Sequence, residues 1–127
     1  MVAEKAETLK DRHRPEKSWG WEEWIVNNDL YCGKRLHFCT LGGHTSLHFH
    51  VKKHETMYAE RGEFQIEMRD TTYGTSYTVT LEEGHSIVIP PATPHRITAS
   101  KLGAFTEAVL VEFSTHHEDS DSYRIEK

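Results

Sequence analysis

Hydrophobic and polar residues alternate in many short segments of this chain, which is the pattern of half-buried β-strands. Three examples are SLHFHV, EFQIEMRD and SYTVTL, at 46–51, 63–70 and 76–81, and AFTEAVLVEFS at 104–114 is expected to form one long strand. Glycine and proline turns separate such segments every 8–12 residues or so, and no segment has the 3.6-residue period of a surface helix. The pattern predicts an all-β fold of about eight to ten short strands, arranged as a sandwich or barrel.

The two ends of the chain differ in character from the middle. Residues 1–17 are charged and poor in apolar side chains, so we expect a short N-terminal arm there and a single domain over residues 18–127. Residues 18–26, SWGWEEWIV, are aromatic and are expected to pack at a sheet edge or a dimer interface. Residues 115–127, THHEDSDSYRIEK, are expected to form an acidic tail.

Composition excludes several classes of protein. The net charge is -5 with no basic cluster, which argues against a nucleic-acid partner. No apolar run approaches the ~20 residues of a membrane span, and the N-terminus lacks the apolar stretch of a secretory signal. Cys32 and Cys39 lie in one expected strand, too far apart to form a disulfide, so both are expected to be free thiols. These features favour a cytoplasmic protein.

Three histidines and one glutamate have the spacing of a metal site. His48 and His50 are two residues apart in an expected strand, so their side chains share one face. Glu55 follows shortly after this strand, and His95 begins another one behind a proline-rich turn. Such a mixed set suits one divalent transition metal, namely Zn, Mn, Fe, Ni or Co, without selecting among them. On a six-coordinate ion, four protein ligands leave two positions for water or a small-molecule substrate.

Six other histidines, from His37 onward, lie outside this set. His54 is a rival to Glu55 because the two residues are adjacent, and His44 is a minor candidate at the rim of the site. His37 lies on an expected strand with its side chain toward the core. The remaining three are expected on the surface or in loops, and they are His85, His116 and His117.

This spacing resembles the two sequence signatures of the cupin superfamily. The first signature matches Gly42, His48, His50, Glu55 and Gly62, and the second matches Gly84, Pro90 and His95. The second departs from the usual pattern at two positions outside the ligand set: Ala92 stands where glycine is common, and Ala99 where asparagine is common. The resemblance implies a single double-sheet jelly-roll barrel with the metal inside, bound by the three histidines and Glu55.

The flanking segments are similar to the cupin domain of type II mannose-6-phosphate isomerases and related sugar isomerases. The similarity rests on KSWGWEEWI at 17–25, on the Lys34–Arg35 pair, and on three positions near the end, Glu112, Ser114–Thr115 and Arg124. The phosphate-specific branch commonly has glutamine where this chain has His48, so a lyxose-isomerase-like enzyme fits equally well.

That resemblance implies metal-dependent aldose–ketose isomerisation of a sugar or sugar phosphate. Glu112 would be the base that moves a proton between neighbouring carbons, and Lys34 would polarise oxygen or relay a proton. Arg124 would bind distal hydroxyls or a phosphate. Alternatively, Glu112 and Arg124 form a surface ion pair and Lys34 is solvated. A homodimer is also expected, since small cupins commonly dimerise and edge strands need covering.

Two further functions remain open from the sequence. An iron-dependent dioxygenase or a lyase acting on a small organic substrate would use the same three histidines and one glutamate. A non-catalytic module that binds sugar or metal would also carry them. Oxygen consumption with bound iron distinguishes the first alternative from an isomerase, and tight sugar binding without turnover distinguishes the second.

Overall fold

The computed structural model describes residues 6–127 and confirms the predicted all-β fold. Two antiparallel sheets contain all the strands, and the described residues include no α-helix. The strands are β1 (Glu16–Lys17), β2 (Gly20–Asn27), β3 (Cys32–Phe38), β4 (Leu47–His50), β5 (Glu55–Arg61), β6 (Glu63–Arg69), β7 (Ser76–Leu81), β8 (Ser86–Ile89), β9 (His95–Lys101), β10 (Ala108–Ser114) and β11 (Ser122–Glu126). Three single turns of 3-10 helix are η1 (Leu9–Asp11), η2 (Ala104–Thr106) and η3 (Asp119–Asp121).

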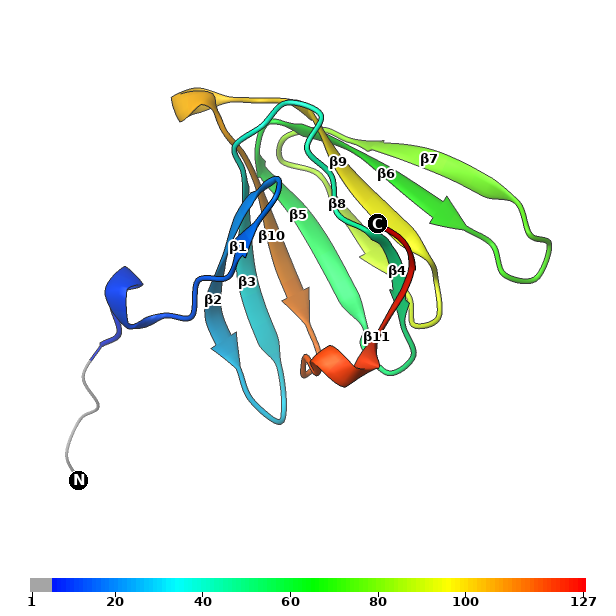
Figure 1. Cartoon of the computed structure of the whole chain (residues 1–127), viewed down its shortest axis with the longest axis horizontal. Coiled ribbons are helices and arrows are strands. Elements are labelled where there is room, and N and C mark those ends of the chain that lie inside the picture. The colour runs from blue at the N-terminus through cyan, green and yellow to red at the C-terminus, as the bar shows by residue number, and fades with distance from the viewer. Residues whose placement is uncertain (1–5) are drawn as a thin grey trace.

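The chain crosses repeatedly between the two sheets, as in a jelly roll. The six-stranded sheet has the order β1-β2-β3-β10-β5-β8, and the five-stranded sheet has the order β11-β4-β9-β6-β7. Figure 1 shows the first sheet on the left and the second on the right. Because strands distant in sequence pair as neighbours, the ligand candidates on β4, β5 and β9 face one shared interior.

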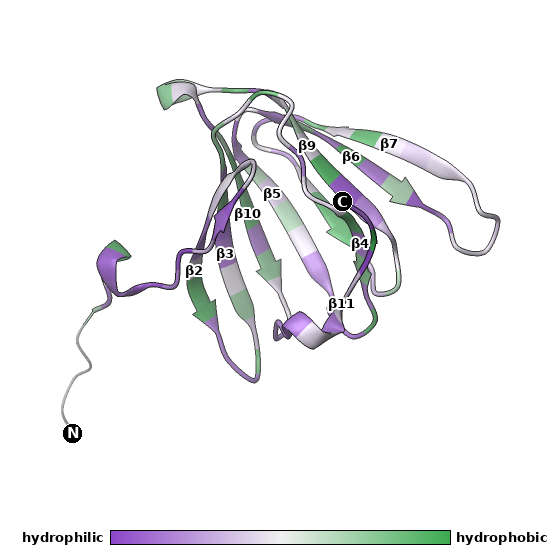
Figure 2. Ribbon diagram, viewed as in Figure 1, coloured by the Kyte–Doolittle hydropathy of each residue, from purple (hydrophilic) through white to green (hydrophobic). Residues whose placement is uncertain are grey.

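The barrel interior is apolar in one half and polar in the other. Burial alternates strictly along β3, β6 and β9, so every second residue faces inward. Figure 2 shows the corresponding alternation of apolar and polar residues along β6. The apolar half packs a continuous cluster that includes Phe38, Phe64, Ile66, Ile97 and Leu110. Its burial supplies the main stabilisation of the fold, which offsets the cost of burying polar groups in the other half.

The register of the six-stranded sheet places the polar half at one end of the barrel. Glu112 on β10 pairs with Lys34 on β3 and with Met57 on β5, and Ser114 pairs with Glu55. These side chains continue the same inward-facing rows that carry the core residues farther along each strand. Lys34, Glu55 and Glu112 therefore stand on sheet positions rather than on loops, which gives these side chains a rigid support.

Ala92, one of the two departures from the cupin signature, adopts a left-handed backbone conformation with φ of 59°. Glycine adopts this conformation without a Cβ clash, whereas alanine is strained by roughly 1–2 kcal/mol. The Ala92 N–H donates a hydrogen bond to the carbonyl of His50 at 2.6 Å, which ties the β8–β9 turn to the strand that carries two ligand candidates. Ala99 is fully buried in the apolar cluster.

The two ends of the chain hold more structure than the sequence suggested. Residues 122–126, expected within an acidic tail, form β11 and pair with β4, so that expectation was wrong. The strand total also exceeds the expected range. Residues 16–17 of the expected arm pair with β2, and residues 1–5 of that arm lie outside the described part of the chain. Both added strands are short and exposed, so they lack the apolar alternation that reveals a half-buried strand.

Among the described residues, no helix has the length and apolar character that crossing a bilayer requires. Cys32 and Cys39 are free thiols, as predicted, with Cys32 buried and Cys39 exposed.

Candidate metal centre

Three imidazoles meet in the polar half of the barrel. His48 and His50 project from alternate positions of β4, and His95 opens β9 directly opposite His48. The centroid of the His48 ring lies 5.1 Å from that of the His50 ring and 4.6 Å from that of the His95 ring. One nitrogen from each ring lies within 4.8 Å of the other two, which is close enough for all three to bind one ion.

Backbone carbonyls hold each of these rings in one orientation. The Nδ1 atoms of His48, His50 and His95 each lie within hydrogen-bond distance of a carbonyl oxygen, and these oxygens belong to Ser46 (2.9 Å), Asp121 (3.1 Å) and Thr93 (2.9 Å). Burial, the largest cause, lowers the pKa of each histidine to about 4, so the rings are neutral at pH 7. A neutral ring that donates through Nδ1 has its free electron pair on Nε2, as a metal ligand requires.

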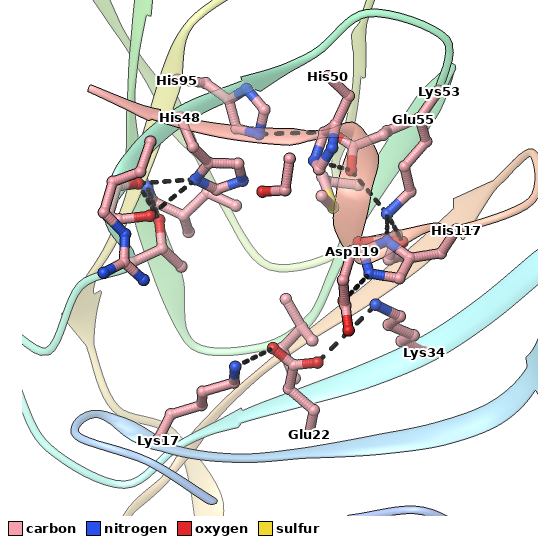
Figure 3. Close-up of a pocket in the computed structure, with 18 of the residues that line it drawn as sticks. Lys17, Glu22, Lys34, His48, His50, Lys53, Glu55, His95, His117 and Asp119 are labelled. Atoms are coloured by element: carbon pink, nitrogen blue, oxygen red, sulfur yellow. Dashed lines mark hydrogen bonds and ion pairs between the residues drawn. The ribbon is translucent and has the colours of Figure 1, made fainter. Parts of the chain in front are cut away.

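Glu55, the predicted fourth ligand, lies beside two of these rings at the first position of β5. Its Oε1 atom is 3.6 Å from His50 Nε2, and its Oε2 atom is 3.3 Å from His95 Nε2. Figure 3 shows Glu55 close to His50 in the wall of the pocket. Glu55 Oε2 and His95 Nε2 are both buried without a hydrogen-bond partner. Burial, and then the charge of Glu112, raise the pKa of Glu55 to about 7. A divalent cation would satisfy both orphaned atoms, so the residues present fit a metal with three nitrogen ligands and one oxygen ligand.

Lys53 is the central residue that the sequence analysis missed. Its ammonium group lies 2.6 Å from Glu112 Oε2, 3.2 Å from Glu55 Oε1 and 2.9 Å from His117 Nδ1. Only 2% of the side chain is exposed. Burial alone would lower the pKa of Lys53, but Glu112 and Glu55 outweigh burial and raise it, so the group stays charged. In the sequence, Lys52 and Lys53 have the character of an ordinary exposed turn. The only signal that could have indicated Lys53 is its position between His50 and Glu55.

Glu112, predicted as a catalytic base, lines the same cavity from β10. Lys53 and the Ser114 hydroxyl both donate to its Oε2 atom, at 2.6 and 3.1 Å. Within residues 6–127, its Oε1 atom has no hydrogen-bond partner. Burial alone would raise the pKa of Glu112, but Lys53 and then Lys34 outweigh burial and lower it to about 2. The Glu112 carboxylate is therefore ionised. Its Oε2 atom is held by Lys53 and Ser114, and its Oε1 atom is available to accept a proton.

Lys34 and Arg124, the other two predicted catalytic residues, also line the cavity. Lys34 is buried, with its ammonium group 3.8 Å from Glu22 Oε1 and 3.9 Å from the centre of the Trp24 ring, so the alternative of a solvated Lys34 is wrong. Arg124 is exposed on β11 opposite His48, and no described residue forms an ion pair with it. The alternative of a surface ion pair between Glu112 and Arg124 does not occur.

The cavity has a volume of about 220 Å³ and is bounded partly by residues expected elsewhere. His117, expected on the surface, lines it instead. The Asn27 side chain exchanges two hydrogen bonds with the His117 backbone, which folds the segment after β10 back over the site. Since the Lys53 ammonium can only donate to His117 Nδ1, His117 Nε2 carries the proton and donates to Asp119 at 3.0 Å.

The tryptophans and the remaining histidines fall into distinct places. Trp19 stacks on Phe38 in the core, Trp21 stacks on His37, and Trp24 lines the cavity. His44 and His54 are exposed and do not line the cavity, so neither occupies the place of Glu55.

Solved structures share this architecture over most of the chain. Oxalate decarboxylase from Bacillus subtilis matches with a TM-score of 0.79 and 19% identity, covering 98% of this chain and 33% of its own. The capsular polysaccharide assembling protein CapF from Staphylococcus aureus matches with a TM-score of 0.78 and 16% identity, covering 91% and 33%. This chain thus spans about a third of the length of either protein, and at such identities the likeness is one of fold.

No curated protein matches the sequence. The family model described as Cupin matches residues 31–123, which is well over half of the chain and includes all four metal-ligand candidates. The match agrees with the two signatures, the two-sheet barrel and the buried histidines described above. The chain therefore belongs to the cupin family.

Proposed function

We propose that this cupin is a metal-dependent aldose–ketose isomerase acting on a small sugar or sugar phosphate. The observation that carries the proposal is the buried pair of Lys53 and Glu112, whose charged groups lie 2.6 Å apart beside the three histidines. Isomerisation needs a group that moves a proton between two carbons and a group that stabilises charge on oxygen. This pair supplies both within one cavity.

Glu112 is the proposed base. Its Oε1 atom would take the proton from the carbon that bears the hydroxyl and return it to the neighbouring carbonyl carbon, so no proton is gained or lost overall. A pKa of about 2 keeps Glu112 ionised at any working pH but makes it a weak base. A divalent metal on the histidines and Glu55 would polarise the substrate carbonyl and acidify the adjacent C–H, which compensates for that weakness.

Lys53 and Lys34 are the proposed cations on the side of the cavity where the substrate oxygens would lie. Both ammonium groups are buried and both lie close to the cavity. Lys53, whose three N–H donors face Glu112, Glu55 and His117, would stabilise by its positive charge the oxygen on which negative charge develops, while a proton passes between the two substrate oxygens. Lys34 lies beside Glu22 in the cavity lining, where its positive charge would offset the charge of that carboxylate. A base, Glu112, beside a cation, Lys53, favours proton transfer over reaction with O₂ as the chemistry of this cavity.

The balance of charge around the cavity supports an anionic substrate. Four cationic and four anionic side chains line the cavity, and they are Lys17, Lys34, Lys53 and Arg124 with Glu22, Glu55, Glu112 and Asp119. A bound divalent cation would leave this lining with a net positive charge. Arg124 is the cation without a carboxylate partner among the described residues, so it is the proposed contact for a phosphate or the distal hydroxyls.

The test is turnover of mannose, lyxose and their phosphates in deuterium oxide by the protein loaded with manganese, zinc, nickel or cobalt. Isomerisation through proton transfer would interconvert aldose and ketose and place deuterium on carbon, both visible by NMR. Absence of both with every sugar and metal would overturn the proposal. Oxygen uptake with bound iron would then indicate a dioxygenase, and tight sugar binding without turnover a binding module.

A further inference from the structure

Asp121 joins the C-terminal segment to the loop that follows the histidine strand. It lies in η3, directly before β11, and its side chain is buried although the residues after it are exposed. Its two carboxylate oxygens accept hydrogen bonds from three consecutive backbone N–H groups at 3.0–3.2 Å, and these belong to Val51, Lys52 and Lys53. One carboxylate therefore fixes the whole 51–53 turn.

The backbone of the same residue holds a metal-ligand candidate. The carbonyl oxygen of Asp121 lies 3.1 Å from His50 Nδ1, so it orients that imidazole with Nε2 toward the site. The turn that its carboxylate fixes begins after His50, carries Lys53 and is followed by His54 and then Glu55. Asp121 thus acts at both ends of the segment that supplies one histidine and the carboxylate of the metal site.

We propose that Asp121 is a positioning residue that couples docking of the C-terminal segment to metal binding. Side chains that orient ligands in this way typically contribute a factor of 10–100 or so in metal affinity. Because binding linkage is reciprocal, a bound metal would in turn hold the 51–53 turn and η3 together. The inference concerns metal retention and is independent of which reaction the cavity performs.

Other anchors of the segment allow this role to be separated from folding. Asn27 holds the His117 backbone through two hydrogen bonds, and β11 pairs with β4 along its length. These contacts do not involve the Asp121 carboxylate. An Asp121→Asn variant keeps the size of the side chain and the carbonyl that faces His50, but it places an NH₂ group against backbone N–H groups that need an acceptor.

The test measures Co²⁺ affinity by competition with a chelator in the wild-type protein, Asp121→Asn, Asp121→Ala and a matched control, Glu118→Gln. Glu118 lies in the same segment, is exposed, and contacts no ligand candidate. We expect both Asp121 variants to lose roughly 10–100-fold in affinity, with an altered Co²⁺ absorption spectrum, and the control to match wild type. Wild-type affinity in a folded Asp121→Asn protein would overturn the proposal and leave Asp121 a purely structural residue.

A second measurement on the wild-type protein keeps the proposal open to refutation if the variants do not fold. Hydrogen exchange of the 51–53 backbone amides is compared with and without Co²⁺. Slower exchange at these amides in the metal-bound protein is expected from the coupling. Exchange that is unchanged by metal would overturn it.

Discussion

The Lys53 ammonium lies 2.6 Å from Glu112 Oε2, and both side chains are almost completely removed from solvent. The same ammonium contacts Glu55 at 3.2 Å, so one cation bridges a metal-ligand candidate and a candidate base. Two carboxylates this close together would repel each other strongly in a buried site without it. Lys53 therefore makes the acidic cluster compatible with a folded barrel.

Replacing Lys53 tests this role in stability. The Lys53→Met variant leaves Glu55 and Glu112 buried without their shared cation, so we expect the metal-free protein to lose about 3–5 kcal/mol in unfolding free energy. Added metal should restore more stability to this variant than to wild type, because a metal supplies the missing positive charge. Urea denaturation with and without metal measures both effects.

Lys52→Met is the matched control for that measurement, since Lys52 is adjacent and its side chain is 75% exposed. It should change stability by less than about 0.5 kcal/mol. Equal losses in the two variants would show that the bridging role assigned to Lys53 is incorrect.

Glu112→Gln separates metal binding from turnover. The substitution removes the proposed base while leaving the three histidines and Glu55 unchanged, so metal content should equal that of wild type. Isomerase turnover should fall by roughly 10²–10⁴-fold, as for loss of general base catalysis. Glu60→Gln, at an exposed position on β5, should retain full turnover. If Glu112→Gln turns over sugar at the wild-type rate, Glu112 is not the base.

Several features of this site follow from sequence because they depend on local spacing. The period of two along β4 puts His48 and His50 on one face whatever the remaining chain does. The alternation along β6 likewise predicts a strand with an inward apolar face. Both features are properties of a single element.

The features that sequence missed depend on how distant segments meet. Lys53 is buried because Glu112, 59 residues later on β10, lies within reach of its ammonium group. Asp121 reaches the 51–53 turn from the far end of the chain, and His117 enters the cavity because Asn27 holds its backbone. Strand β11 was missed because its edge pairing leaves all five residues exposed.

Arg124→Gln tests the proposed anionic contact. Charge-assisted hydrogen bonds are worth about 1.5–3 kcal/mol, so KM for a phosphorylated sugar should rise by roughly 10–100-fold. The kcat value and the KM for the neutral sugar should change little. Arg69→Gln is a suitable control, because Arg69 lies on β6 away from the cavity lining. An unchanged KM for the phosphorylated sugar would remove Arg124 as its contact.

Gly62→Ala tests the turn between β5 and β6 that the cupin signature marks. Gly62 has φ of 77°, and a Cβ there would lie 2.4 Å from the Lys101 carbonyl oxygen. We expect a loss of about 2–3 kcal/mol in unfolding free energy from strain and overpacking together. Gly74→Ala has a similar φ of 69° but meets no atom within 4 Å, so it should cost only about 1 kcal/mol. Equal losses in thermal or urea unfolding would contradict the close packing at Gly62.

The most direct test of the metal site is elemental analysis of the purified protein beside His95→Ala and His85→Ala. His95 is a buried ligand candidate, whereas His85 is exposed and outside the cavity lining. We predict about one transition metal ion per chain in wild type and in His85→Ala, and a large loss in His95→Ala. No metal in the wild-type protein after reconstitution, or full metal in His95→Ala, would contradict the assignment of these histidines as ligands.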